Sequence, residues 1–341
     1  MILKKKSVYL GIAIFIVCLL FILPLSILVG SRELGTDTIH YEYSFYLFKN
    51  YSYISNEPGI YLLAWLSLLL GGDVQVYFWF VFIVSFIFMN LAFYKFFYKM
   101  FEPREICLLY FVFIGSYLFS TWFQIVSLSV IRQGLALFVL YFAIACYVKQ
   151  DYKQALVFII IAILTHKSVL LLVPFLILLR LHDKKFYSLF FISALLYPLG
   201  VTEYVVMTLS SLTGIPVYSL ISSYSEDNVR YFGFNYLYFI YTIFWTVLGL
   251  TLRKLGCVGY GLREYDLVLK VYSCLAMILY TFGFASFSNR YGLFSWLFIP
   301  FVQVVVLSQF VNFKYSIYYY CGFIFCFISA VYYSNHFFKF W

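Results

Sequence analysis

The chain has 341 residues, of which 65% are hydrophobic and only 11% are charged, and its mean hydropathy is +0.94. A soluble fold cannot bury that much apolar surface, so the composition excludes a soluble protein. The formal charge of +9 does not indicate nucleic-acid binding, because the basic residues form short clusters between apolar runs and no basic stripe.

Apolar runs close to the roughly 20 residues that cross a bilayer as a helix recur along the chain, for example at 8–29, 74–94, 131–148 and 292–311. They are apolar at odd and even positions alike, which excludes the alternation of an outer-membrane barrel strand. We therefore predict an all-α polytopic membrane protein. The first run follows three lysines like a signal peptide, but it is longer than a signal core, so we expect a retained anchor.

Two segments have ambiguous topology: residues 58–70 are short for a span, and residues 155–180 are long and interrupted by His166 and Lys167. If 58–70 lies at the outer surface and 155–180 forms a hairpin of two short helices, 16 of the 23 Lys and Arg residues lie inside. Making 58–70 a full crossing leaves 8 inside, and making 155–180 one span leaves 11. Because short cytoplasmic loops retain positive charge, the first arrangement is favoured.

This arrangement predicts a single membrane domain, 1–341, with a cytoplasmic N-terminus and long extracytoplasmic loops at 30–73 and 208–235. The loop 30–73 would carry short surface helices. The eleven predicted spans are 8–29, 74–94, 106–123, 131–148, 154–165, 168–180, 187–207, 236–252, 267–285, 292–311 and 315–334.

Ionisable residues near membrane depth are costly, so they are candidates for function. Four places qualify, and the topology puts all of them on the outer side: Asp37, Arg132 with Gln133, His166 with Lys167, and Arg290. Arginines present planar forks that suit diphosphate oxygens, and a nearby carboxylate could act as general base towards a sugar hydroxyl. Glycosyl transfer from a lipid diphosphate donor would use both.

Each of these residues also has a purely structural interpretation. Arg132 and Arg290 could extend their guanidinium groups to lipid phosphates at helix ends, and Lys167 could be an interfacial anchor. A lone histidine is often a hydrogen-bonded packing residue, and Asp37 could be a solvated or capping aspartate. Their convergence on one face favours the functional interpretation, although spacing alone does not separate catalysis from glycan binding.

At these positions the chain resembles the EpsG-like family of bacterial polysaccharide polymerases, which are Wzy-type enzymes. The layout is also similar to the GT-C class of membrane glycosyltransferases. The matching pieces occur in the family's order: Gly35-Thr36-Asp37 with Tyr41, Glu57-Pro58-Gly59, Arg132-Gln133-Gly134, His166-Lys167-Ser168, and Arg290 before an apolar run.

The resemblance implies roles for single residues. Asp37 becomes the candidate base or acceptor-binding residue, and His166 a second catalytic candidate that contacts donor or acceptor. Arg132 and Arg290 become the candidate diphosphate ligands. Other substrate-binding candidates are Gln133, Tyr41, Lys167 and Glu57, with Glu57 expected to support the first loop.

The implied function is polymerisation of lipid-linked oligosaccharide repeat units for O-antigen, capsule or exopolysaccharide, at the outer face of the bacterial cytoplasmic membrane. The substrates would be undecaprenyl-diphosphate-linked oligosaccharides, no cofactor is expected, and a flippase and a chain-length regulator are candidate partners. Asp37, Glu33 and Glu42 could bind a divalent metal ion, but the charges of Arg132 and Arg290 make one unnecessary for a diphosphate, so no metal site is predicted. A flippase for the same lipid-linked glycan is the alternative, because it needs a cationic cavity but no base. A membrane O-acyltransferase is disfavoured, because residues 8–29 contain no histidine or arginine.

Overall fold

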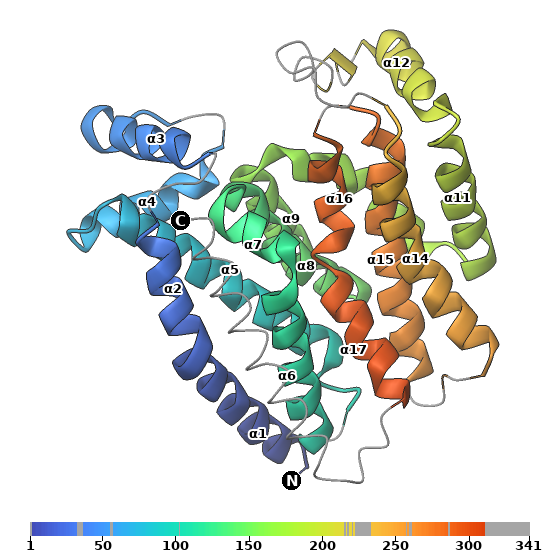
Figure 1. Ribbon diagram of the computed structural model, residues 1–341, viewed down its shortest axis with the longest axis horizontal. Coiled ribbons are helices and arrows are strands. Elements are labelled where there is room, and N and C mark those ends of the chain that lie inside the picture. Colours follow the sequence, from blue (N-terminus) through green and yellow to red (C-terminus); the bar gives the residue numbers. More distant parts are fainter. Residues whose placement is uncertain are drawn as a thin grey trace. The chain divides into compact units, whose positions relative to one another are not determined.

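The computed structural model describes residues 2–32, 37–54, 57–101, 103–214, 216, 218–219, 221, 233–256, 258, 261–285 and 287–310. Most of these residues lie in α-helices, and no β-strand occurs among them (Figure 1). The predicted span 315–334 and the Gly35-Thr36 pair lie outside the described residues.

The described helices confirm an all-α protein with several candidate membrane spans. Six are long and apolar enough to cross a bilayer, or eight if each of two bent helix pairs counts as one span. Two further apolar helices, Gly59–Leu69 and Tyr152–Thr165, are shorter. The predicted total of eleven spans therefore stays a prediction.

The chain divides into two compact units. The first contains residues up to Leu170 together with the chain from Gln303 onward, and the second contains Leu171–Val302. The prediction of a single membrane domain over 1–341 stays a prediction, because a division into two compact units does not by itself define independent domains.

The first unit contains nine α-helices among its described residues before Leu170, and a π-helical turn, Cys18–Ile22, joins the first two. The helices are α1 (Ile2–Val17), α2 (Leu23–Gly30), α3 (Thr38–Tyr51), α4 (Gly59–Leu69), α5 (Val74–Phe97), α6 (Pro103–Phe119), α7 (Thr121–Leu128), α8 (Ile131–Val148) and α9 (Tyr152–Thr165).

Helix α8 forms the centre of this unit. Its residues from Gln133 to Cys146 are all buried, and it packs against α5, α7 and α9. Arg132 is the only charged residue between Ile131 and Val148, so nearly the whole helix can lie among apolar neighbours. Gly134 allows α7 to approach closely, because a Cβ there would lie 2.6 Å from the Cβ of Val126.

The predicted outer loop 30–73 contains two helices, α3 and α4, which lie near the end of α2 and away from the N-terminal end of α1 (Figure 1). Helix α3 ends at Tyr51, and the next residue, Ser52, has a positive φ of 50°. Helix α4 begins after Pro58, a residue whose fixed φ suits a helix start. Asp73 then starts α5 by accepting hydrogen bonds from the amides of Gln75 and Val76. The extracytoplasmic position of this loop remains a prediction.

The second unit is built around α15. Before it come a short segment of helical turns that includes α10 (Val173–Leu176), then α11 (Asp183–Leu196), α12 (Val201–Thr213) and α14 (Tyr236–Lys254). After α15 (Leu262–Phe282) come α16 (Ser288–Trp296) and α17 (Ile299–Phe310), the last of which continues past the boundary of the unit.

Polar and aromatic contacts hold the helices of the second unit around α15. Phe190, Tyr197 and Tyr280 belong to one buried cluster that joins α11 to α15. Tyr272 of α15 donates a hydrogen bond to the carbonyl of Thr242 at 2.8 Å, and Trp296 of α16 donates to the Thr242 hydroxyl at 2.7 Å. These bonds satisfy polar groups in a region with little access to water.

Two predicted spans differ from the structure because the chain bends within them. The predicted span 187–207 is two helices, α11 and α12, at 100° to each other, and Gly200 has a φ of +69° at the bend. The predicted span 106–123 ends early, because α6 and α7 are bent by 68° and Ser120 starts α7 by accepting a hydrogen bond from the Phe123 amide. Hydropathy averages over such breaks and does not detect them.

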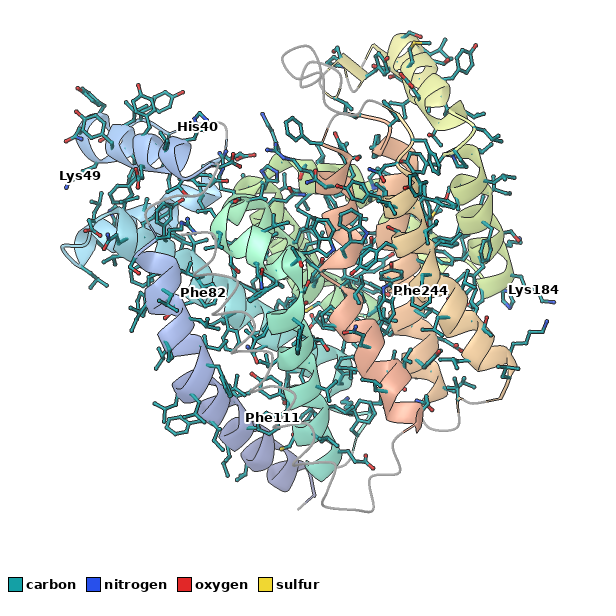
Figure 2. All side chains as sticks on the ribbon, viewed as in Figure 1. His40, Lys49, Phe82, Phe111, Lys184 and Phe244 are labelled. Carbon is teal, nitrogen blue, oxygen red and sulfur yellow. The ribbon has the colours of Figure 1, made fainter. Side chains whose placement is uncertain are left out.

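The outer surface of several helices is apolar, as expected for contact with lipid. On α14, Ile240, Phe244 and Val247 are 57%, 50% and 44% exposed at helical spacing. Phe244 is labelled in Figure 2. A soluble protein would rarely expose such a stripe. Figure 2 also shows Lys184, which is exposed near the start of α11.

Candidate active site

Glu57 is the centre of the candidate site. It precedes Pro58 in the segment between α3 and α4, and its side chain is only 7% exposed. Next to it, Gly59 packs against the end of α9, where a Cβ at Gly59 would lie 2.8 Å from the backbone nitrogen of Thr165. The glycine of this motif thus lets the Glu57 segment lie directly against the residues that precede His166.

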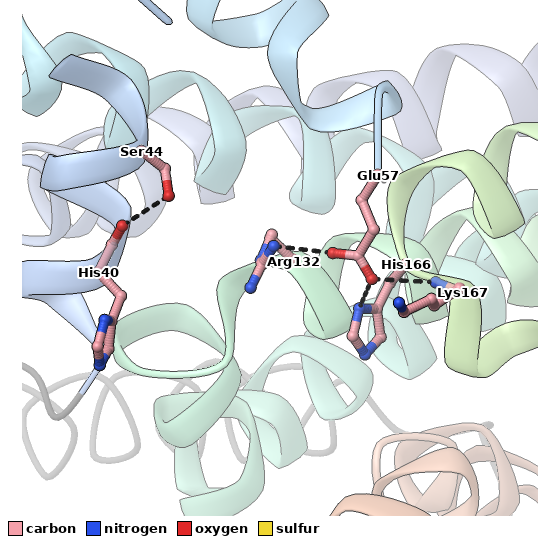
Figure 3. A network of polar contacts seen from close by, with 6 residues as sticks. All are labelled: His40, Ser44, Glu57, Arg132, His166 and Lys167. Atoms are coloured by element: carbon pink, nitrogen blue, oxygen red, sulfur yellow. Dashed lines mark hydrogen bonds and ion pairs between the residues drawn. The ribbon is translucent and has the colours of Figure 1, made fainter. Parts of the chain in front are cut away.

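Three groups converge on the Glu57 carboxylate (Figure 3). Arg132 Nη1 lies 2.8 Å from Oε2, and His166 Nδ1 lies 2.8 Å from Oε1. The backbone amide of Lys167 also donates to Oε1, at 3.3 Å. Residues separated by 75 to 110 positions in the chain therefore form one network, which we call the Glu57 network.

Arg132 lies in the first turn of α8. A cation at the N-terminus of a helix meets the positive end of the helix dipole, so the nearby carboxylate of Glu57 offsets an unfavourable position. The guanidinium carbon also lies 5.2 Å from the ring centre of Tyr41. The Arg132 side chain is 35% exposed, and its Nε has no hydrogen-bond partner among the residues that the structure describes.

His166 ends α9. Its backbone is extended, with φ −156° and ψ 115°, while its amide still donates to the carbonyl of Ala162 at 2.9 Å. The following residues from Lys167 form a 3₁₀-helix. The change of direction turns the imidazole towards Glu57, and its side chain is 23% exposed. The break that the sequence predicted at His166 is present.

Opposing effects act on the Glu57 carboxyl. Burial raises its pKa, whereas the hydrogen bond and charge of His166, the charge of Arg132 and the Lys167 amide lower it, and the net pKa is below the ordinary value. Glu57 is therefore ionised at neutral pH. A buried carboxylate with its oxygens occupied is a poor proton acceptor but a strong anchor for its donors.

Asp37 and Tyr41 are one helical turn apart at the start of α3. The Tyr41 amide donates to the Asp37 carbonyl at 3.2 Å, and the Tyr41 ring is 5% exposed. Tyr41 thus links the start of α3 to Arg132. Asp37 is half-buried, and its side chain does not cap the helix amides.

The remaining predicted residues have different surroundings. Gln133 is 2% exposed, and Lys167 has an exposed side chain but contributes its backbone amide to Glu57. Arg290 is half-buried on α16 in the second unit, where its guanidinium carbon lies 4.8 Å from the Phe287 ring centre. Phe287 has a φ of 59°, a strained conformation for a bulky residue, directly before the turn that carries Arg290.

The model of the EpsG family matches residues 15–340, nearly the whole chain. The chain belongs to the EpsG family. No curated protein and no solved structure matches it. Membership in the EpsG family supports a membrane protein of polysaccharide biosynthesis with a polymerase-like, glycosyltransferase-like role.

In the first unit of this EpsG-family protein, Arg32 is a buried cation that was not predicted from the sequence. It is 2% exposed, donates to the carbonyl of Ser127 at 2.7 Å, and stacks 3.8 Å from the ring centre of Phe78. Ser127 lies in the last turn of α7, so Arg32 supports the carbonyl end of that helix just before α8 begins. The available signal was its position: an arginine directly follows the first apolar run, on the side where the topology predicts few cations.

Asp37, Glu33 and Glu42 are the residues that could bind a divalent metal ion according to the sequence. Glu33 lies outside the described residues. Within the described part of this EpsG-family chain, no group of three or more His, Cys, Asp or Glu side chains is placed to hold a metal ion.

Proposed function

We propose that the protein polymerises lipid-linked oligosaccharide repeat units, by glycosyl transfer from a polyprenyl-diphosphate donor to the end of a second lipid-linked glycan. The observation that carries the proposal is the Glu57 network, in which a buried carboxylate holds a partly exposed guanidinium and a partly exposed imidazole. A cation and a proton-transfer group side by side suit a reaction that expels a diphosphate.

In this proposal Arg132 binds diphosphate oxygens through its planar donor fork, and Lys167 adds positive charge. The resemblance to the family makes Arg290, which belongs to the second unit, a further candidate diphosphate ligand. Asp37 binds hydroxyls of the acceptor sugar. Tyr41 and Gln133, which are buried, support the Arg132 side of the site. The diphosphate leaving group drives the reaction, so no nucleotide or other cofactor is required.

The proposed location is the extracytoplasmic face of the bacterial cytoplasmic membrane, in the synthesis of O-antigen, capsule or exopolysaccharide. The proposed partners are a flippase, which would bring the donor to the outer face, and a chain-length regulator. The apolar helices of the chain support its membrane position.

Reconstitution tests the proposed reaction. The purified protein is placed in liposomes with a synthetic polyprenyl-diphosphate-linked repeat unit, and the products are separated by size. We expect a ladder of longer lipid-linked glycans and release of polyprenyl diphosphate, with both lost in Arg132→Gln. Movement of a labelled lipid-linked unit between leaflets without elongation would instead identify a flippase.

Cysteine labelling tests the proposed orientation. After replacement of the native cysteines, single cysteines at positions 37, 167 and 290 should react with an impermeant thiol reagent from outside, and one at position 183 should not. Outside labelling at position 183, or protection at position 37, would overturn the proposed topology.

A further inference from the structure

The contact between Glu57 and His166 determines which ring nitrogen carries the proton. An ionised carboxylate only accepts hydrogen bonds, so the Nδ1 atom that lies 2.8 Å from Oε1 must donate. In the neutral imidazole the lone pair is then on Nε2. Figure 3 shows Nε2 on the side of the ring opposite to Glu57.

The ring has little freedom to leave this arrangement. The His166 amide donates a hydrogen bond to the Ala162 carbonyl. The Lys167 amide donates to Oε1 of Glu57, the same oxygen that Nδ1 contacts. Gly59 packs directly against Thr165. Backbone on both sides of His166 is therefore attached either to α9 or to Glu57. Such a held imidazole needs no reorganisation before proton transfer.

The Nε2 atom of His166 has no hydrogen-bond partner within the described residues, and the His166 side chain is 23% exposed. Glu57 itself is unsuited to take a proton, because Arg132, His166 and the Lys167 amide already donate to its two oxygens. A neutral imidazole with its lone pair on Nε2 can accept a proton there, and histidine is the side chain that most often acts as a general base.

We propose that His166 accepts the proton of the acceptor hydroxyl through Nε2, and that Glu57 acts through His166 as a positioning residue. This inference rests on the proposed polymerase function. The acceptor oxygen forms a bond to the anomeric carbon of the donor as its proton passes to Nε2. The bond from that carbon to the phosphate oxygen breaks, and its electron pair leaves on polyprenyl diphosphate. His166 then returns the proton to water.

The test uses the full-length protein in liposomes with a synthetic lipid-linked repeat unit, and compares His166→Ala, Glu57→Gln and the double variant with wild type. We expect His166→Ala to lower turnover by about 10²–10⁴-fold, the usual contribution of a general base. Added imidazole should restore part of that turnover. A histidine that only maintains structure would not give this rescue.

Glu57→Gln separates positioning from structural support. We expect it to lower turnover by about 10–100-fold, as for other residues that orient a functional histidine. In the His166→Ala background the same change should lower turnover no further, because the residue through which Glu57 acts is gone. The donor concentration that gives the half-maximal rate should rise in the wild-type and His166→Ala backgrounds alike, because Glu57→Gln removes the ionic partner of Arg132 in both.

Two matched controls are available. His40→Ala removes an exposed histidine of α3, and Asp151→Asn removes the carboxylate that pairs with Lys95 at 3.0 Å. Both variants should keep turnover within about threefold of wild type, because substitutions away from the site usually have small effects.

Distinct outcomes separate the two levels of the proposal. If the wild-type protein does not produce glycans longer than the supplied repeat unit, the polymerase function itself is overturned. A wild type that elongates, with a His166→Ala variant that imidazole does not restore, overturns the proton-transfer role. If the fold losses of the two single variants multiply in the double variant, the positioning role of Glu57 is overturned. If the Glu57→Gln variant does not accumulate in the membrane, Glu57→Asp is tested instead. Reduced turnover with an unchanged donor concentration at half-maximal rate would support the positioning role of Glu57. Unchanged turnover would overturn that role.

Discussion

The two units contain ion pairs of opposite design. In the Glu57 network the carboxylate is the buried partner, at 7% exposure, and the cation Arg132 is 35% exposed. In the pair between Lys270 and Asp183 the cation is buried, at 11% exposure, and the carboxylate is 44% exposed. The distances are similar, at 2.8 Å and 3.0 Å.

The difference concerns which group each pair can offer to a ligand. Lys270 directs its ammonium group to the Leu181 carbonyl and Asp183, and it lies 5.3 Å from the Phe186 ring centre. It therefore joins the start of α11 to α15 and leaves only a carboxylate in contact with solvent. The Glu57 network leaves donors accessible, and only this arrangement can bind an anion such as a diphosphate. Hence a salt bridge alone does not indicate a binding site for an anion, because such a site also requires an accessible cation.

The largest effect is expected at Arg132. Arg132→Gln should lower polymer formation by about 10²–10³-fold, the usual result of removing one donor from a site that stabilises developing charge. Arg132→Lys should fall between this variant and wild type, because it keeps the charge but loses the planar fork. Product ladders from reconstituted protein provide the measurement.

Arg253 provides the matched control for that change. It is 37% exposed and pairs with Asp266 at 2.8 Å, nearly the same exposure and distance as Arg132. Arg253→Gln should retain polymer formation within about threefold. Equal losses at the two arginines would remove the distinction between the Glu57 network and an ordinary ion pair.

A smaller effect is expected at Gly59. In Gly59→Ala the new Cβ must displace backbone of Thr165, so the Glu57 segment moves away from His166. Overpacking of this kind costs typically about 1–3 kcal/mol, and we expect turnover to fall by about tenfold while the protein still inserts. Gly11→Ala is the control, because a Cβ at Gly11 meets no atom within 4 Å. Unchanged turnover in Gly59→Ala would show that the close packing is not needed.

For the Lys270 pair the expected effect is on stability. Lys270→Met removes the donor to the Leu181 carbonyl and should destabilise the protein by about 1–3 kcal/mol, seen as a lower melting temperature in detergent. Polymer formation well below that temperature should stay within about threefold of wild type. A loss of turnover without a loss of stability would instead give this pair a role in the reaction.

The smallest effect is the acid dependence of stability from Glu57. Because its folded-state pKa is lowered, its contribution is complete above the ordinary glutamate pKa and is lost as the pH falls through the lowered value. The difference in melting temperature between wild type and Glu57→Gln should be constant near neutral pH and should shrink below about pH 4. A difference that persists unchanged to lower pH would exclude the ionised carboxylate as its source.

Properties that depend on a local run of residues could be predicted from the sequence. The spans predicted at 74–94, 131–148 and 236–252 agree with α5, α8 and α14 to within three residues at each end, because hydropathy over about 20 residues decides membrane insertion. The ordered polar motifs also sufficed to identify the resemblance to the EpsG family, which the match over 15–340 confirms.

The candidate site was predicted in part. Arg132, His166 and Glu57 were named from the sequence, but Glu57 was expected only to support its loop, and Asp37 was expected to be central. The structure places Glu57 between two residues that are 75 and 109 positions away from it in the chain. Sequence spacing carries no information on such a contact, because packing of α4 and α9 against each other brings the groups together.

Tertiary structure alone decided the direction and burial of the polar groups. The bends between α6 and α7 and between α11 and α12 depend on single turns. Hydropathy averaged over the length of a span does not detect such turns. Burial of Glu57 beside the partly exposed imidazole of His166 depends on Gly59 lying against Thr165, a contact between distant segments. Composition and local pattern determine that a segment enters the membrane as a helix, whereas the neighbours that it packs against determine which atom of a polar residue remains available for chemistry.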